Sequence, residues 1–114
     1  MAAGAYDITC EQGSTFSRTL IVRDADGNLR DFSDYTARMH VRRTTASTDT
    51  VIELTTENGR LAITSSGEIV LNLDAATTAT LTDGGVYDLE IEHTDGTVER
   101  VVEGIFTLDL EVTR

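Results

Sequence analysis

The residues with the greatest chemical potential lie in one stretch, YDLEIEHTDGTVERVVEG, which runs from Tyr87 to Gly104. It holds the densest set of acidic side chains in the chain, together with His93. Such a cluster suggests a metal site or acid–base chemistry, or else the solvated side of a β-hairpin. A catalytic carboxylate pair requires a cleft in which two different environments separate the two pKa values. An exposed hairpin offers no such cleft, so the sequence favours the solvated surface.

A β-hairpin is predicted at Asp95 and Gly96, because this dipeptide separates two runs rich in Leu, Ile and Val. A two-residue turn would set Glu92 opposite Glu99, a like-charge pair that costs roughly a few tenths of a kcal/mol. A three-residue turn shifts the register by one residue and removes this repulsion. We therefore predict a three-residue turn in which Gly96 is left-handed and forms part of a bulge.

Two registers are compatible with a three-residue turn, and Arg100 favours both over the two-residue turn. Looping out residues 95–97 pairs Glu92 with Arg100. Looping out the three residues that begin one position earlier pairs Glu90 with Arg100 instead. Both registers exchange a repulsive cross-strand pair for an attractive one, so the choice stays open.

Metal-binding and nucleophilic groups are scarce elsewhere in the chain. Imidazole comes only from His40 and His93, and Cys10 is the only cysteine, which excludes an internal disulfide. We predict that Cys10 is a small buried apolar residue. Calcium is the best metal alternative, but the DADG turn lacks the alternating acids and distal glutamate of an EF-hand loop. We therefore predict no catalytic residues, no cofactor and no metal site.

Composition restricts the partners of the chain. Its 114 residues include 20 acids and 9 arginines but no lysine, for a formal net charge of −11. This charge argues against a nucleic-acid partner, since a phosphate backbone would be repelled. The absence of lysine excludes Schiff-base and phosphate-loop lysines. No stretch is long and apolar enough to span a membrane and no signal pattern opens the chain, so we expect a soluble protein made in a cytoplasm.

Short alternating runs of apolar and polar residues, rich in threonine, predict strands separated by turns about every 8–12 residues. One segment, DAATTATL, breaks the alternation and predicts a single helical turn with Asp74 as its N-cap. The pattern predicts an all-β protein, an immunoglobulin-like antiparallel β-sandwich in one domain, residues 1–114. The short helical turn is expected at the crossover between the two sheets.

The most specific motif is DGGVYDL, which spaces Asp83, Gly85 and Tyr87 as in the tyrosine corner of immunoglobulin-like sandwiches. In that corner the tyrosine starts a strand after the crossover, and its hydroxyl bonds to upstream backbone. The absence of tryptophan and of a cysteine pair excludes a true antibody domain. The alternative is a tyrosine at an ordinary strand start.

A row of basic residues is predicted on one strand, YTARMHVRR, where alternation turns Tyr35, Ala37, Met39 and Val41 inward. The outward residues form a candidate interface because arginine is enriched at binding surfaces. The alternative is that they pair with glutamates on the neighbouring strand, such as Glu53. The candidate interface residues are Arg38, His40, Arg42 and Arg43.

Several of these motifs occur together in a known family. The segments EQGSTFSRTLIVRDADGNLRDFSDYTARMHVRR and LNLDAATTATLTDGGVYDLEIEHTDGTVERVVEG, with the ending EVTR, resemble the small β-sandwich proteins encoded among tailed-phage structural genes. They are similar to the N-terminal domain of siphophage baseplate upper proteins, which attaches receptor-binding parts to the tail. The resemblance covers the chain from about Tyr6 to Arg114, and it is carried by the order of the motifs.

The resemblance implies a non-enzymatic virion protein, synthesised in the host bacterial cytoplasm and present in multiple symmetric copies. Its partners would be other phage structural proteins. The chain lacks the linker and helical parts of the larger baseplate proteins, so we expect an adaptor at the tail tip, baseplate or fibre attachment point. Residues 1–10 and 105–114 are the expected edge strands, which could pair with a neighbouring chain.

Three alternatives remain open. The first is a capsid decoration or cement protein, for which the strong negative charge suits an outer surface. The second is a calcium-dependent carbohydrate-binding module, which would melt at a higher temperature when calcium is added. The third is a hydrolase that uses the acidic hairpin, although no serine lies at a recognisable spacing from a histidine and an acid.

Overall fold

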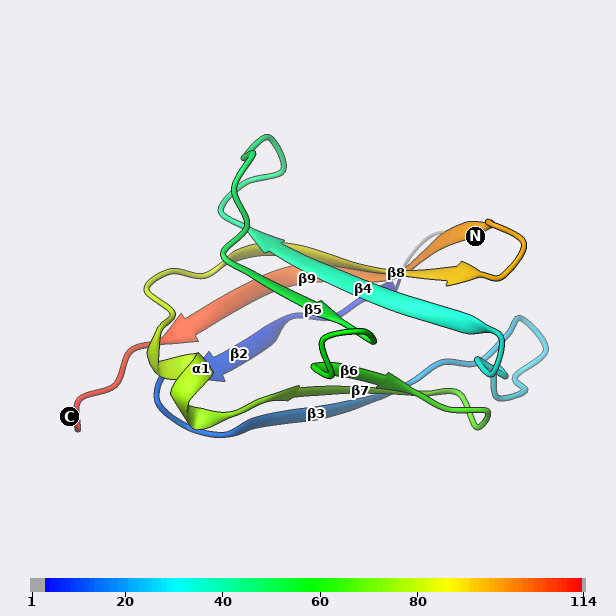
Figure 1. Cartoon of the computed structure of the whole chain (residues 1–114), viewed down its shortest axis with the longest axis horizontal. Coiled ribbons are helices and arrows are strands. Elements are labelled where there is room, and N and C mark those ends of the chain that lie inside the picture. The colour runs from blue at the N-terminus through cyan, green and yellow to red at the C-terminus, as the bar shows by residue number, and fades with distance from the viewer. Residues whose placement is uncertain (1–3, 114) are drawn as a thin grey trace.

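Two β-sheets pack face to face in the computed structural model, which describes residues 4–113 (Figure 1). Sheet A has the order β1-β9-β8-β4-β5, with β2 also paired to β9, and sheet B has the order β3-β7-β6. The elements in chain order are β1 (Gly4–Ala5), β2 (Ile8–Glu11), β3 (Phe16–Ile21), β4 (Tyr35–Arg42), β5 (Ile52–Thr55), β6 (Leu61–Ile63), β7 (Glu68–Leu73), α1 (Ala75–Ala79), β8 (Gly85–His93) and β9 (Val98–Asp109).

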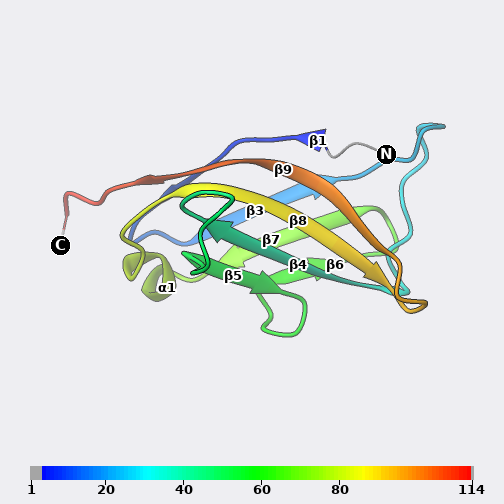
Figure 2. The ribbon, with the colours of Figure 1, turned by 90° about the horizontal axis from the view of Figure 1, so that it is seen from above.

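The strand order is that of an immunoglobulin-like sandwich. The run β9-β8-β4-β5 matches strands G, F, C and C′ of such folds, and β3-β7-β6 matches B, E and D. Figure 2 shows the two layers from above, with α1 at one end of the molecule. The predicted fold class is therefore confirmed, including the single short helix between two strands of different sheets. No helix in the described part of the chain is long and apolar enough to cross a membrane.

The core lies between the sheets and follows the predicted alternation. On β4, Ala37, Met39 and Val41 are buried, whereas the residues between them face outward. Cys10 is fully buried in the same core, and burial raises the pKa of its thiol, as expected for an apolar packing residue. The other fully buried large side chains are Ile8, Phe32, Leu54, Ile69, Leu71, Leu89, Ile91 and Phe106.

The α1 turn carries the chain from sheet B to sheet A as the sequence predicts. Asp74 is its N-cap and accepts a hydrogen bond of 2.8 Å from the backbone N–H of Thr77. The hydroxyl of Thr78, which is fully buried, donates to the carbonyl of Ser14 at 2.8 Å. The turn is thereby anchored to the loop that precedes β3.

The β8–β9 hairpin adopts the second of the two registers considered above. Residues 94–96 form the loop, the backbone N–H of His93 donates to the carbonyl of Thr97 at 2.9 Å, and Gly96 has a φ of 93°. Glu90 lies opposite Arg100, and Glu92 lies opposite Val98 rather than Glu99. The prediction of a three-residue turn with a left-handed Gly96 is confirmed.

A bulge on β9, in which Val101 is the extra residue opposite Leu89 and Glu90, then changes the register for the rest of the hairpin. An unbroken ladder would pair Leu89 with Val101, but the structure pairs it with Val102. Asp88 consequently lies opposite Glu103, a like-charge pair that a three-residue turn alone would have avoided. Arg100 compensates, because its Nε lies 3.3 Å from an oxygen of Asp88.

The prediction that both terminal segments are edge strands is only half right for residues 4–10 and 105–113, and its remaining residues, 1–3 and 114, lie outside the described part of the chain. Strands β1 and β2 lie at the edge of sheet A and run parallel to β9, with Gly4 opposite Val102 and Ile8 opposite Phe106. Strand β9 is therefore an inner strand between the N-terminal segment and β8. The two segments pair with each other within one chain, because their apolar faces both belong to the core.

Tyr87 forms a contact different from the predicted tyrosine corner. Its hydroxyl donates to the backbone carbonyl of Tyr6, on the N-terminal segment, and not to the crossover just before it. Tyr87 lies opposite Gly104, and a Cβ on Gly104 would come 2.2 Å from the carbonyl oxygen of Tyr6. We call Tyr6, Tyr87 and Gly104 the N-terminal junction. Burial raises the pKa of Tyr87, which keeps its hydroxyl protonated as a donor.

The glycine of the predicted corner motif also has a steric role. A Cβ on Gly85 would lie 2.0 Å from the carbonyl oxygen of Arg42, at the point where β8 begins beside the end of β4. Asp83, the third residue of the motif, binds Arg43 instead of supporting a corner. The motif thus marks the start of β8, although its hydrogen bonds differ from those of the expected corner.

Candidate interaction surfaces

The outward side of β4, β8 and β9 is a charged face, which we define as Arg38, His40, Asp88, Glu90, Glu92 and Arg100. On it, Arg38 lies between two glutamates of β8, with its Nε 3.3 Å from Glu90 and its Nη1 3.5 Å from Glu92. The side chain of Arg38 is 46% exposed, so solvent screens both contacts. The alternative of cross-strand charge pairing therefore describes Arg38 well.

The other three predicted interface residues also have partners within the chain. His40 lies 2.8 Å from Glu53 on β5, the partner that the sequence suggested. Arg42 donates to the backbone carbonyls of Ser47 and Thr48, which holds the loop between β4 and β5. Arg43 pairs with Asp83 across 2.6 Å and is the most exposed of the row. These residues lie in one region of the structure, but their hydrogen bonds and ion pairs are made with other residues of the same chain.

The acids of the hairpin do not converge on one point. Asp88 pairs with Arg100, and Asp95 binds the backbone of its own turn through Thr97, at 2.8 Å. Hydrogen bonds from Thr97 lower the pKa of Asp95, so it stays ionised. Among residues 4–113, no three His, Cys, Asp or Glu side chains are grouped to hold a metal ion. The arrangement suits a solvated surface and offers no paired carboxylates in a cleft.

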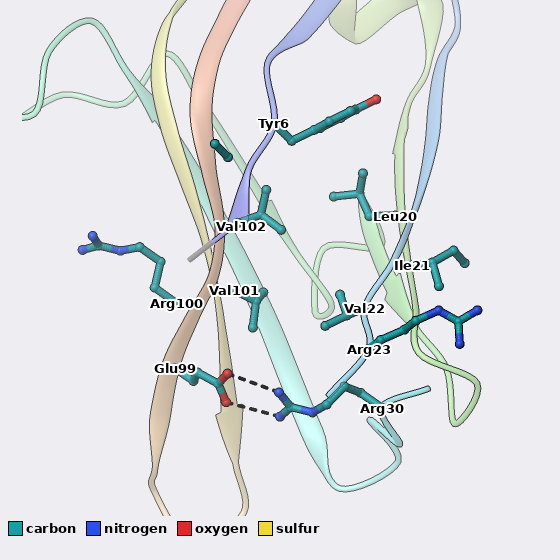
Figure 3. Close-up of a pocket in the computed structure, with 12 residues that line it drawn as sticks. Tyr6, Leu20, Ile21, Val22, Arg23, Arg30, Glu99, Arg100, Val101 and Val102 are labelled. Atoms are coloured by element: carbon teal, nitrogen blue, oxygen red, sulfur yellow. Dashed lines mark hydrogen bonds and ion pairs between the residues drawn. The ribbon is translucent and has the colours of Figure 1, made fainter. Parts of the chain in front are cut away.

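A groove that the sequence did not predict lies on the flank of the sandwich, between the β1–β9 edge of sheet A and β3 of sheet B (Figure 3). Its volume is about 390 Å³. Its apolar walls come from Tyr6, Leu20, Val22, Val101 and Val102. Figure 3 shows both valines of β9 on the groove side and Arg100 pointing away from it, an orientation that the bulge produces because it turns consecutive residues to one side.

An ion pair closes one end of this groove. Arg30 forms two hydrogen bonds of 3.2 Å with Glu99, one from each terminal nitrogen, as Figure 3 shows. The carboxylate of Glu99 raises the pKa of Arg30, and the guanidinium also lies over the ring of Phe32, 5.5 Å from its centre. The bond joins the segment after β3 to β9, and it links the two walls of the groove.

Two exposed apolar side chains distinguish this flank from the charged face. Tyr6 is 40% exposed and Ile21 is 52% exposed, and both line the groove. One sequence feature does indicate where the N-terminal segment contacts β9, since a glycine inside a strand often marks the close approach of another backbone. Gly104 is such a glycine, at the point where the backbone of Tyr6 runs beside β9.

Comparisons with known proteins bear on the fold. No protein-family model matches the chain, and no curated protein matches it. Among solved structures, the chain is similar to Tim-1, with a TM-score of 0.50 and 13% identity over 100% of this chain and 99% of that one. It is also similar to the extracellular domain of the voltage-gated sodium channel beta4 subunit, with a TM-score of 0.46 and 10% identity over 98% and 97% of the two chains. The likeness to Tim-1 agrees with the immunoglobulin-like sandwich described above.

Proposed function

We propose that this chain is a non-enzymatic interaction module of a bacteriophage virion, an adaptor at the tail tip, baseplate or fibre attachment point. It acts through protein–protein contacts made by sheet faces, loops and strand edges. The observation that carries the interaction role is the apolar groove beside β3, with Tyr6 and Ile21 exposed at its rim. Exposed apolar patches on a soluble domain are typical of binding sites.

The non-enzymatic part of the proposal is supported by how the charged groups are used. The ion pairs of the charged face are spread along three strands, and each leaves its members solvated. Acid–base catalysis needs groups that converge beside a substrate pocket. The groove beside β3 has apolar walls and contains one internally paired acid, Glu99. Such a groove fits a polypeptide segment better than a reacting small molecule.

The virion location rests on the order of sequence motifs. The order of four motifs resembles that of the baseplate-type sandwiches: the start at Gly13–Phe16, the YTARM strand, the helical turn followed by YDLEI, and the terminal VTR. In this chain they mark the start of β3, the strand β4, the α1 crossover with β8, and the segment after β9. Each motif therefore lies at a boundary or a core position of one sandwich.

The test is to find the protein in separated parts of the particle. Purified tails and purified heads from the same phage preparation are digested and quantified by mass spectrometry, with a tail-tube protein and the major capsid protein as fraction markers. We expect peptides of this chain to follow the tail marker at a constant ratio. Its absence from the tails would overturn the proposal.

A second candidate, a decoration protein of the phage head, is favoured by one specific observation. The net charge of −11 would give a capsid an acidic, solvated outer surface and oppose non-specific association. The same experiment decides between the two, because a decoration protein follows the capsid marker. Recovery with neither marker would contradict both.

A further inference from the structure

Strand β3 presents an open edge. Among the described residues it pairs with β7 alone. The backbone N–H of Val22 donates to the carbonyl of Gly67 at 2.8 Å. In an antiparallel pair the backbone N–H and C=O groups of alternate residues point toward the partner strand, so this bond identifies which residues of β3 use theirs to bind β7. By that alternation, the backbone N–H and C=O groups of Ser17, Thr19 and Ile21 point away from β7. In related sandwiches an A strand lies beside strand B, whereas here the N-terminal strands pair with β9 instead.

The open edge adjoins the apolar groove and an unusual local charge. Leu20 and Val22 of the same strand region form one wall of the groove. Arg18 and Arg23 lie at either end of this stretch and bind backbone carbonyls, of Thr9 and Gly27 respectively. Within residues 4–113 neither arginine takes part in an ion pair with a carboxylate. On a chain of net charge −11, this edge is a local site for an acidic segment.

One segment of the chain has the complementary pattern. After β9 ends, residues 110–113 continue past the α1 end of the sandwich (Figure 1). Their apolar side chains are uncovered, since Leu110 is 63% exposed and Val112 is 91% exposed. They alternate with acids, because Asp109 and Glu111 flank Leu110. Four extended residues span about 13 Å, which matches the distance from residue 17 to residue 21 along a strand.

We propose that residues 110–113 of one copy add as a strand to the β3 edge of a second copy. The backbone groups of Thr19 and Ile21 then gain partners, and the leucine and valine cover the apolar rim of the groove. The acids lie on the opposite face of the added strand, the side on which Figure 3 shows Arg23. The segment and the edge are different surfaces, so the contact is head-to-tail and propagates into a ring or a chain of copies. This proposal deepens the proposed function by naming a partner, a second copy of this chain.

The first test blocks each surface separately. Thr19→Pro removes an outward N–H that β7 does not use, and proline is tolerated at such an edge position. Val112→Asp puts a charge on the apolar face of the added strand, and Val98→Asp is its matched control on the hairpin, where Val98 is 46% exposed.

Sedimentation velocity at increasing protein concentration should show that the mass of the wild type and of Val98→Asp rises. The two blocked variants should stay monomeric. A wild type that stays monomeric up to millimolar concentration would overturn the proposal.

The second test uses a mixture of the two blocked variants. Thr19→Pro keeps an intact segment and Val112→Asp keeps an intact β3 edge, so together they form one contact and then stop. The mixture should reach a mass of two chains and no more, whereas an interface that uses the same surface on both copies gives no such rescue. Circular dichroism verifies that each variant is folded, and Leu110→Ser replaces Val112→Asp should that variant unfold.

These results are independent of the virion experiment. Purified protein that does not associate refutes the strand addition and leaves the tail location to be decided by fractionation. A protein that associates but follows neither virion marker refutes the location and keeps the contact.

Discussion

The charged face and the N-terminal junction both draw residues from the stretch between Tyr87 and Gly104, yet they are stabilised in opposite ways. The charged face uses many long side chains in solvated ion pairs, such as Arg38 with Glu90 at 3.3 Å. The junction uses one hydroxyl, one carbonyl and the missing side chain of one glycine. We therefore expect that replacing any single acid of the stretch changes the stability little. Substitutions of Tyr87 and Gly104, its first and last residues, are expected to change it more.

The largest expected effect comes from filling the space above Gly104. Gly104→Ala places a Cβ about where the Tyr6 carbonyl oxygen now lies, at 2.2 Å, so the backbone of β1 or β9 has to shift. We expect a loss of about 1–3 kcal/mol in the free energy of unfolding, the usual cost of overpacking. Urea denaturation followed by circular dichroism measures it.

Gly96→Ala is the control for this change. Gly96 also requires a glycine, because its φ is 93°, but nothing lies within 4 Å of a Cβ at that position. The cost there is that of a left-handed residue, about 1 kcal/mol. If Gly96→Ala proves as damaging as Gly104→Ala, then steric contact with Tyr6 is not what distinguishes the junction.

The next effect tests the hydrogen bond of the junction. Tyr87→Phe removes the donor and leaves the carbonyl of Tyr6 without it, for which we expect a loss of about 1–2 kcal/mol. Tyr6→Phe removes the same atom from a half-exposed ring whose hydroxyl bonds to no described residue, so it should change the stability little. Equal losses in the two variants would contradict the role assigned to Tyr87.

These two regions also show what the sequence could and could not predict. Local rules were sufficient for the charged hairpin, because Asp95, Gly96 and the cost of facing glutamates together select a three-residue turn. They could not place the bulge at Val101, which turns Val101 and Val102 to the groove, since a bulge depends on what packs against both faces of the sheet.

The N-terminal junction lay beyond local rules for a different reason. Tyr6 and Tyr87 are 81 residues apart, and a parallel pairing between the two ends of a chain leaves no turn signal between its strands. The motif Asp83-x-Gly85-x-Tyr87 correctly marked the start of β8, but spacing alone does not identify the acceptor of a hydroxyl. The groove is formed by the same long-range pairing, so the sequence did not predict it either.

A smaller effect is expected on the charged face. A double-mutant cycle on Arg38→Ala and Glu90→Ala should give a coupling energy of about 0.2–1 kcal/mol, as for other solvated pairs. The coupling should shrink in 1 M salt, because both side chains are well exposed and screened. A coupling above 2 kcal/mol that persists in salt would show that a pair on this face contributes as much to stability as the contacts of the junction.

The smallest effect separates the β8–β9 turn, which joins two strands of the charged face, from the N-terminal junction by the response to acid. Hydrogen bonds from Thr97 lower the pKa of Asp95 below its ordinary value of 3.8, so the folded state favours the carboxylate more than the unfolded state does. This contribution is complete above the ordinary pKa and disappears as the pH falls through the lower, folded value. The advantage of the wild type over Asp95→Asn in melting temperature should therefore be present at pH 5 and shrink toward pH 2.5. The advantage over Tyr87→Phe should stay constant across the same range, because that hydroxyl remains protonated throughout. If both melting-temperature differences shrink together as the pH falls, then the effect of acid comes from the whole sandwich and not from Asp95. The predicted contrast between a charged and a neutral contact would then be wrong.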